Sequence, residues 1–485
     1  MTPNSQIPVQ AKFLPPLEPA FRPAALFNRI FQQEIDKSGK GMPLVFGLER
    51  ANGSVSRFET RVFTADHPWA VHNAYYSERI LKFLLWQRGG WRVYVGGPGE
   101  IGETLRRCYS PDGARAFDYH FMGEDVYQKT FTIIACKPEA VPAENESEQS
   151  LGRHLEGCRI GFDLGASDIK VSAVIDGEAV FSKEIEWNPR EQSDLSYHRE
   201  KIMGALKMAL AKLPRLDAIG GSSAGVIVNN RPMVASLFRG IPKARYDEVH
   251  NLFLQIRQDM GVPLEIVNDG EVSALAGSMS LEKNAVLGTA FGSSLAAGYV
   301  TPKGNITNWL NELAFAPIDY NPQASIDEWS GDRGVGALYM SQQCVFRLAP
   351  RVGIEIPTEL SPAQKLKLVQ EKLEAGHSGA RQIWECIGIY LGYAIAHYAS
   401  FYELENMLIL GRVTSGKGGE IILEGANEVL RGEFPEHAGR INLQLPDELS
   451  RRLGQSVAAA SLPEITTGAD TTSRPDISGG NLTNR

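Results

Sequence analysis

Three short segments, far apart in the chain, combine the residue types that bind phosphate groups. They are Asp163–Ser167 (DLGAS), Gly288–Ser294 (GTAFGSS) and Gly411–Gly416 (GRVTSG). A strand that ends in aspartate, glycine and serine can turn its backbone N–H groups and a hydroxyl toward a polyphosphate, while the carboxylate holds Mg²⁺ through water. The order of these segments therefore predicts a nucleotide site.

The residues expected to handle the phosphates and the metal come from the first two segments. They are Asp163, Gly165, Ser167, Gly288, Thr289 and Gly292, with Mg²⁺ held by Asp163. Each has a simpler interpretation, because aspartate after a strand is commonly a turn residue and glycine permits a positive φ in any sharp hairpin. The apolar runs at 284–287 and 295–300 favour a phosphate clamp between two strands.

The composition is that of an ordinary soluble globular protein. With 485 residues, 43% of them hydrophobic, the chain is long enough for two or three packed units. A formal net charge of −8 argues against a nucleic-acid surface, which needs clustered Lys and Arg. The five widely spaced cysteines predict neither a disulfide framework nor a zinc knuckle.

Location and membrane contact follow from two further patterns. The N-terminus lacks the charged and then apolar pattern of a signal peptide, so export is not expected. The apolar run 383–402 is long enough to span a membrane, but it carries Glu385 and His397, which favours a buried helix. Together with the unpaired cysteines, these features predict a cytoplasmic protein.

The order of apolar patterns predicts four regions. Residues 1–150 open with a Pro-rich lead-in, contain a hairpin at Asn52–Gly53 and end in a linker, which predicts a small N-terminal α+β domain of unknown role. Alternating strands and helices over 158–267 and 268–460 predict two α/β lobes, the second ending in a helix. Residues 464–485 have almost nothing to bury and are predicted to be disordered.

The glycine segments, taken with two more, resemble a known family. The segments Asp163–Ser167, Asn268–Asp269, Leu287–Gly292, Asn311–Leu313 and Leu410–Val413 occur in the order found in the ROK family of sugar kinases and repressors. The resemblance covers 158–459 and implies a two-lobed actin/hexokinase-like (ribonuclease H-like) ATPase fold. It implies that Gly411 and Arg412 contact the adenosine of ATP, although relatives usually have a second glycine where Arg412 stands. The run 415–419 either shapes that pocket or is a flexible loop.

The pair Asn268–Asp269 has two interpretations. It follows the predicted strand 264–267 and opens a predicted helix, where asparagine and aspartate are favoured as N-caps. The resemblance instead implies that Asn268 binds the sugar, and that Asp269 is the general base for the hydroxyl that attacks the γ-phosphorus. Phosphoryl transfer requires mainly positioning and charge neutralisation, so one carboxylate with Mg²⁺ is sufficient. We favour the catalytic interpretation.

The chain departs from the family at its sugar and zinc positions. ROK sugar kinases generally follow the glutamate equivalent to Glu312 with a histidine that touches the sugar and binds zinc, and then with a Cys-rich loop that ends in a second glutamate. Here Phe315, Val335 and Ala337 stand at these positions. No structural zinc is therefore expected. The loss of two hydrogen-bonding partners, about 1–3 kcal/mol each, implies an altered substrate or a pocket that no longer binds sugar.

Charged residues near these positions allow two interpretations of the substrate site. They are Asp319, Asp327, Asp332 and Arg333, which either bind a modified or acidic sugar or belong to a solvated loop.

Two functions from different classes remain. The first is ATP-dependent phosphorylation of a sugar or sugar-derivative hydroxyl, with Asp269 as base, Asn268 and Glu312 on the substrate, and Mg·ATP in the interlobe cleft. The second is a catalytically weak sugar- and nucleotide-binding sensor or regulator without a DNA-binding domain, because 1–150 does not resemble the basic winged helix-turn-helix of the repressors. Retention of both Asp163 and Asp269 favours the kinase. Neither function involves nucleic acid or a membrane, and homodimer formation is left open.

Overall fold

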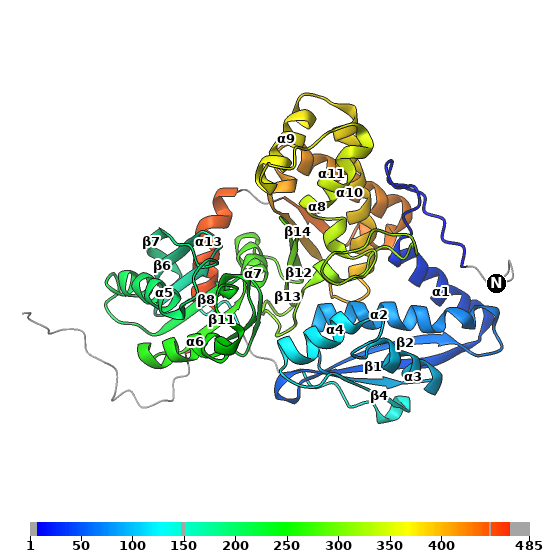
Figure 1. Ribbon diagram of the computed structural model, residues 1–485, viewed down its shortest axis with the longest axis horizontal. Coiled ribbons are helices and arrows are strands. Elements are labelled where there is room, and N and C mark those ends of the chain that lie inside the picture. Colours follow the sequence, from blue (N-terminus) through cyan, green and yellow to red (C-terminus); the bar gives the residue numbers. More distant parts are fainter. Residues whose placement is uncertain (1–6, 147–150, 446–447, 466–485) are drawn as a thin grey trace, which may run out of the picture. The chain divides into compact units, whose positions relative to one another are not determined.

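The chain forms two compact units, shown in the computed structural model of Figure 1. Unit 1 comprises Met1–Glu148, Ala285–Ala297 and Asn308–Leu445, and unit 2 comprises Gln149–Asn284, Gly298–Thr307 and Pro446–Arg485. The structure describes residues 7–146, 151–445 and 448–465. Residues 147–150 of the predicted linker and 466–485 of the predicted disordered tail lie outside these ranges. Each unit combines helices with sheet, which agrees with the predicted α/β class.

The N-terminal part of unit 1 is an α+β layer. Its sheet has the order β2–β1–β3–β4, in which β2, β1 and β3 are antiparallel neighbours and β4 runs parallel to β3. The elements are β1 (Gly41–Glu49), β2 (Val55–Phe63), β3 (Arg92–Gly96), β4 (Thr132–Cys136), α1 (Ala24–Ser38), α2 (Asn73–Arg88), α3 (Gly99–Cys108) and α4 (Ala116–His120). The hairpin expected at Asn52–Gly53 is confirmed, since Glu49 pairs with Val55 across that turn. Figure 1 shows α2 along one face of this sheet.

The rest of unit 1 is built on a second sheet, of order β13–β12–β14–β15, in which β13 belongs to unit 1 as far as Ala297 and to unit 2 from Gly298. Strands β12, β14 and β15 run parallel. The elements are β12 (Val286–Phe291), β13 (Leu295–Val300), β14 (Asn406–Leu410), β15 (Asn442–Gln444), α8 (Gln342–Leu348), α9 (Pro362–Glu374), α10 (Ser378–Tyr398), α11 (Lys417–Glu433) and α12 (Pro435–Ala438). The apolar run expected to be a buried helix is α10. Within the described ranges, no helix has the length and apolar character required to cross a membrane.

Residues 7–23 of the Pro-rich lead-in are held in unit 1 by side chains from much later in the chain. The backbone N–H of Lys12 donates to a Glu433 carboxylate oxygen at 2.9 Å. Glu18 forms ion pairs with Arg347 and with Arg351, and their charges hold the pKa of Glu18 below its ordinary value although burial alone would raise it. The lead-in is therefore tied to helices that come more than 300 residues later in the chain.

The segment interpreted as a linker packs on the first sheet. Val141 is buried, and Glu146 forms an ion pair with the buried Arg50. These partners explain why 137–146 is an ordered part of unit 1. Independent folding of 1–150, and the division of the remainder into two lobes, stay predictions.

Unit 2 is a five-stranded sheet of order β11–β8–β5–β6–β7 with flanking helices. Strands β11, β8 and β5 are parallel, and β5, β6 and β7 form the antiparallel meander that the sequence predicted. The elements are β5 (Cys158–Leu164), β6 (Asp168–Ile175), β7 (Glu178–Glu186), β8 (Ala218–Ser223), β9 (Val226–Val228), β10 (Arg231–Val234), β11 (Leu264–Asn268), α5 (Leu195–Leu210), α6 (Tyr246–Met260), α7 (Asp269–Leu281) and α13 (Glu448–Ala460).

Two glycines allow α13 to pack directly on this sheet. A Cβ on Gly161 in β5 would lie 1.7 Å from the carbonyl oxygen of Ser456, and one on Gly220 in β8 would lie 1.6 Å from that of Ala459. Neither contact is sterically allowed, so any larger residue would displace the helix. The C-terminal helix is thereby fixed over two strands whose ends carry candidate site residues.

We predict that Gly220→Ala destabilises the protein by about 1–3 kcal/mol or more, because α13 must shift to admit the new Cβ. Gly204→Ala is the matched control, since Gly204 lies in α5 with no atom within 4 Å of its Cβ position. There alanine should stabilise by up to about 1 kcal/mol. Denaturant unfolding measures both changes, and equal stability of the two variants would contradict the close contact.

Candidate functional site

The strand ends of unit 2 bring the predicted acidic residues to one edge of the sheet. Strands β5, β8 and β11 are parallel neighbours, so their carboxyl ends meet there. Asp163 on β5 lies in register between Ser222 on β8 and Lys170 on β6. Asn268 ends β11, and Asp269 is the first residue of α7. The topology therefore gathers both predicted carboxylates.

Asp163 is a buried carboxylate with a partner on each side. Only 7% of the residue is exposed. Its Oδ1 accepts a hydrogen bond from the Ser222 hydroxyl at 2.6 Å, and its Oδ2 lies 3.6 Å from Lys170 Nζ. Burial alone would lower the pKa of Lys170, but the carboxylates of Asp163 and Asp168 raise it. Sequence reasoning missed Lys170 and Ser222, although cross-strand register would have placed them beside Asp163.

The Asp163 carboxylate suits a magnesium ion that is held largely by water and phosphate. Mg²⁺ usually keeps several waters and takes one or two carboxylates together with substrate phosphates. Among residues 7–146, 151–445 and 448–465, no group of three or more His, Cys, Asp or Glu forms a protein cage for a metal. Asp163 keeps acceptor capacity beside its single hydrogen bond, so the residues present fit this metal.

Asp269 is half-buried in the first turn of α7. Its Oδ1 accepts a hydrogen bond from the Gly270 N–H at 3.0 Å. Burial, and after it the negative charge of Asp163, raise the pKa of Asp269 to about 6. A carboxylate with this pKa is deprotonated at neutral pH and is a stronger base than an exposed aspartate, as a general base requires.

Asn268 is the N-cap of α7, as the structural interpretation of the sequence predicted. Its Oδ1 accepts from the Gly270 N–H at 2.7 Å, and its Nδ2 donates to the Gly225 carbonyl at 2.7 Å. The side chain thereby fixes the start of the helix and the backbone of Asp269. Its role on a substrate stays a prediction.

Gly165 and Ser167 lie in the turn between β5 and β6. The Gly165 N–H donates to the Asp168 carbonyl at 2.9 Å, which closes the hairpin. Ser167 is exposed, and its hydroxyl donates to an Asp168 carboxylate oxygen at 3.1 Å. The turn follows Asp163 at the same sheet edge, with the Gly165 N–H already used by the Asp168 carbonyl.

In unit 1, Gly288 and Thr289 lie inside strand β12, which corrects the expected turn at Gly288. Both residues are buried, and the Thr289 hydroxyl donates to the Leu408 carbonyl at 3.3 Å. Apolar residues continue the strand as far as Phe291, so the turn begins only at Gly292. There the Gly292 N–H donates to the Ser294 carbonyl at 3.0 Å, and the turn is accessible.

Gly411 brings the third glycine segment beside the second. It has a φ of 101°, and a Cβ at this position would lie 2.5 Å from both the N and O atoms of Phe291. Only glycine permits this approach to the backbone next to Gly292. Arg412 is exposed. Residues 417–419 form the first turn of α11, so the run 415–419 is not a flexible loop.

Glu312 is held by the carboxyl end of α2. The last carbonyls of an α-helix lack partners within the helix. Here the Gln87 carbonyl accepts from the Asn311 N–H at 2.8 Å, and the Trp86 carbonyl accepts from the Glu312 N–H at 2.9 Å. Asn311 has a φ of 49°, and its Oδ1 accepts from the Tyr402 hydroxyl at 2.7 Å. Sequence reasoning predicted a role for Glu312 but not its dependence on the N-terminal part of the chain.

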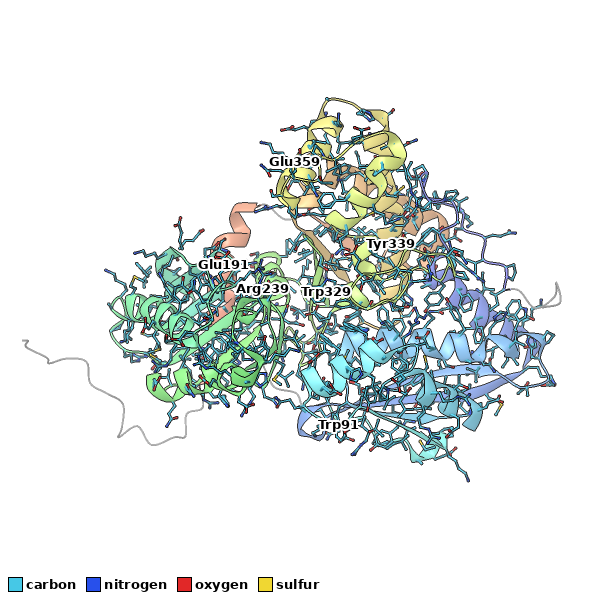
Figure 2. The ribbon with its side chains drawn as sticks, in the orientation of Figure 1. Trp91, Glu191, Arg239, Trp329, Tyr339 and Glu359 are labelled. Atoms are coloured by element: carbon cyan, nitrogen blue, oxygen red, sulfur yellow. The ribbon has the colours of Figure 1, made fainter. Side chains whose placement is uncertain are left out.

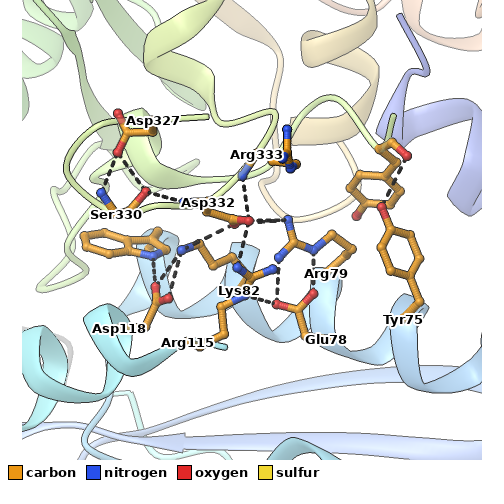
Figure 3. Close-up of polar contacts among 12 residues, drawn as sticks. Tyr75, Glu78, Arg79, Lys82, Arg115, Asp118, Asp327, Ser330, Asp332 and Arg333 are labelled. Carbon is orange, nitrogen blue, oxygen red and sulfur yellow. Dashed lines mark hydrogen bonds and ion pairs between the residues drawn. The ribbon is translucent and has the colours of Figure 1, made fainter. Parts of the chain in front are cut away.

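Three cations from the N-terminal part of unit 1 surround Asp332 (Figure 3). Arg115 Nη1 lies 2.8 Å from its Oδ1, and its Oδ2 lies 3.1 Å from Arg79 Nη1 and 3.5 Å from Lys82 Nζ. Burial alone would raise the pKa of Asp332, but the cations hold it well below its ordinary value. Asp332 is therefore a buried structural acceptor, neither solvated nor free to bind a sugar.

Two further carboxylates balance the charges in this cluster. Glu78 pairs with Arg79 and Arg115, each at 2.6 Å. Asp118 lies 2.8 Å from Lys82 Nζ and accepts from the Trp86 indole N–H at 2.5 Å. Three cations thus face three anions, and all except Arg115 are buried. We call these six residues and Trp86 the ion cluster.

Asp319 and Asp327 also have protein partners. Asp327 accepts from the Ser330 N–H and hydroxyl, both at 2.7 Å, and so caps its own turn. Asp319 accepts from the Arg22 N–H at 3.0 Å and from the Tyr339 hydroxyl at 2.7 Å, while burial raises its pKa to about 6. Both carboxylates are buried, whereas their neighbours Glu328 and Trp329 are exposed.

The family's sugar and zinc positions are filled by packed apolar groups. The ring centroid of Phe315 lies 4.4 Å from that of Trp86 and 5.8 Å from that of Phe117. Val335 and Ala337 are buried. An aromatic contact with the N-terminal part of unit 1 thus replaces a polar residue expected from the resemblance.

Comparison with known proteins bears on the fold. No protein-family model and no curated protein matches the chain. A solved ROK family transcriptional regulator, described as a homologue of the E. coli MLC protein, matches with a TM-score of 0.51 and 20% identity, over 64% of this chain and 79% of the other. The ROK hexokinase from Thermus thermophilus has a TM-score of 0.49 and 16% identity, over 62% and 97% of the two chains. The ROK family glucokinase from Streptomyces griseus, solved with glucose and AMPPNP, has a TM-score of 0.46 and 17% identity, over 63% and 98%. The chain therefore shares the α/β fold of the ROK family regulator, which is the fold that the resemblance implied.

Proposed function

We propose that the protein is an ATP-dependent kinase that phosphorylates a hydroxyl group of a sugar or sugar derivative. The observation that carries the proposal is the pairing of Asp269, whose pKa is raised to about 6, with the buried Asp163 at one sheet edge. A protein that only binds sugar has no need of a raised carboxylate pKa beside a second acid, whereas a general base does.

The proposed reaction uses Asp269 as the proton acceptor. Its carboxylate takes the proton of the acceptor hydroxyl, whose oxygen forms a bond to the γ-phosphorus while the bond from that phosphorus to ADP breaks. Asp163 is proposed to hold the magnesium ion, which supplies charge neutralisation to the phosphates when it is bound. Lys170, 3.6 Å from Asp163, adds a second positive charge at the same edge.

The remaining roles are proposed for residues of both units. The turns at Gly165–Ser167 and Gly292–Ser294 are proposed to contact phosphate through groups other than the Gly165 and Gly292 N–H, which close the turns. Gly411 and Arg412 are proposed to contact adenosine, and Asn268 and Glu312 the acceptor. A side-chain role for Thr289 is not supported, because its hydroxyl donates to Leu408 inside the sheet. A cytoplasmic location and homodimer formation stay predictions.

A second function is supported by the packed apolar groups at the sugar positions. Phe315 packs against Trp86 with its ring tilted by 38°, and Ala337 is buried, so neither position offers a hydrogen bond to a sugar hydroxyl. A sensor or regulator that binds sugar and nucleotide without turnover would tolerate this change. The comparisons do not separate the two functions, because the matching structures include a regulator as well as sugar kinases. Retention of Asp163 and Asp269 together favours the kinase.

We predict that Asp269→Asn lowers kcat by about 10²–10⁴-fold, the usual contribution of a general base. The substitution keeps the acceptor oxygen for the Gly270 N–H, so Mg·ATP should still stabilise the protein by about 2.7 kcal/mol at a hundred times its Kd. ADP release and product mass are measured across sugars, amino sugars and sugar acids. Asp259→Asn, at an exposed position on α6, is the control and should retain full activity.

Turnover that survives Asp269→Asn would remove this residue as the base. Absence of phosphorylated product from the wild type across the panel, with Mg·ATP stabilisation intact, would support the sensor instead.

A stability measurement tests the raised pKa without any substrate. An acid whose pKa is about 6 in the folded protein, against about 4 in the unfolded chain, reduces the free energy of unfolding above pH 6. That loss fades as the pH falls toward 4, because the folded form then takes up its proton. We predict that Asp269→Asn is more stable than the wild type at pH 8, and that the difference shrinks at pH 4.5. Urea unfolding at both pH values measures this, and a variant less stable than the wild type at pH 8 would contradict the raised pKa.

A further inference from the structure

Helix α2 contacts the segment 311–336 at two separate places. At its carboxyl end, the carbonyls of Gln87 and Trp86 accept from the N–H groups of Asn311 and Glu312. Along its length, Arg79 and Lys82 reach Asp332 in the ion cluster. One rigid helix thus holds both ends of this segment.

The end contact fixes the backbone that carries Glu312. Asn311 is in a left-handed conformation that is uncommon for a residue other than glycine, and it persists because both its N–H and its side chain have partners. The ring of Phe315, on the following turn, packs at 4.4 Å from Trp86. The direction in which Glu312 points therefore depends on where α2 ends.

The ion cluster fixes the other end of the segment. Residues 326–333 form a small hairpin in which Ile326 bridges to Arg333, and the Asp327 N–H donates to the Asp332 carbonyl at 2.8 Å. Its buried base is the Asp332 carboxylate among three cations, while Trp329, labelled in Figure 2, is 78% exposed. The hairpin is therefore anchored through Asp332 and exposes the ring of Trp329 to solvent.

The chemistry of the ion cluster suits positioning better than stabilisation. The free energy lost when charges are removed from water is nearly as large as the free energy gained from their pairing. Apolar residues of the same volume would therefore often stabilise a fold to the same extent. Paired charges instead demand one geometry, and the Arg115 fork meets Glu78 and Asp332 at once, at 2.6 Å and 2.8 Å. Because three cations contact the Asp332 carboxylate, its position is fixed.

We propose that α2 and Arg115 are the positioning element of the acceptor site, with Arg79, Lys82 and Arg115 acting through Asp332 on the segment that carries Glu312. This inference rests on the proposed function, because it assigns Glu312 to the acceptor. It gives the N-terminal part of the chain a role in substrate binding rather than in recruiting a partner. Substitutions in the ion cluster should then weaken acceptor binding selectively.

The test compares two buried aspartates of the same hairpin. Asp332→Asn removes the charge that faces α2, whereas Asp327→Asn retains the acceptor oxygen that caps the Ser330 turn and touches no cation of the cluster. For Asp332→Asn we expect the acceptor KM to rise at least about tenfold, since small misplacements of substrate contacts have effects of this size. The KM for ATP should change less than about twofold, and Asp327→Asn should resemble the wild type. An unchanged acceptor KM in Asp332→Asn, or an equal rise in both KM values, would overturn the proposal.

Arg115→Lys provides a milder variant in case Asp332→Asn does not fold. Lysine keeps the charge but cannot meet Glu78 and Asp332 with one planar group. Its acceptor KM should lie between those of the wild type and Arg115→Met. Equal KM values for Arg115→Lys and Arg115→Met would contradict a role for the fork geometry.

Hydrogen exchange separates this inference from the kinase proposal. If the wild type phosphorylates no acceptor, the kinase proposal fails, but the amides of 311–317 still report on positioning. We expect them to exchange at least about tenfold faster in Asp332→Asn, and within about twofold of the wild type in Asp327→Asn, because only the first loosens the segment from α2. Equal protection in both variants would overturn the inference whatever the outcome of the activity assay.

Discussion

Asp163 and Asp269 lie at one edge of the sheet in unit 2, and the burial of Asp269 beside Asp163 is the constraint on which the proposed chemistry depends. Asp163 accepts a hydrogen bond from the Ser222 hydroxyl at 2.6 Å and lies 3.6 Å from Lys170 Nζ. Asp269 accepts a hydrogen bond from the Gly270 N–H, and burial, followed by the negative charge of Asp163, raises its pKa to about 6. One acid is thereby suited to a metal ion and the other to a proton, as is common where two titratable groups lie in different environments.

The N-terminal part of the chain is joined to the rest of unit 1 by hydrogen bonds and ion pairs. The lead-in is tied down through Glu18, and α2 is tied through its end carbonyls and the ion cluster. Several of these links join residues separated by more than 200 positions, so removal of the first 146 residues would take away the three cations that surround the buried Asp332. The described residues up to 146 are therefore an integral part of unit 1 and not a separate domain attached to a ROK-like fold.

Local patterns predicted much of the fold and part of the site. Alternation and turn residues predicted the first hairpin and the meander, and the helix cap at Asn268 followed from residue preferences. The turn expected at Gly288 was wrong because apolar neighbours continue strand β12 through Phe291. The charges on α2 were not assigned a role from the sequence, because the partner of Arg79 is Asp332, 253 residues later in the chain. No pattern along one helix reveals such a partner, and Lys170 likewise became a site residue only through strand register.

The most direct test of the account is a crystal structure of the protein with Mg²⁺ and a non-hydrolysable ATP analogue. The account predicts a metal ion bound to the Asp163 carboxylate directly or through water, with the γ-phosphate on the side of the site where Asp269 lies. A nucleotide bound away from Asp163, or an Asp269 carboxylate sealed off from the γ-phosphate and from any acceptor, would contradict it.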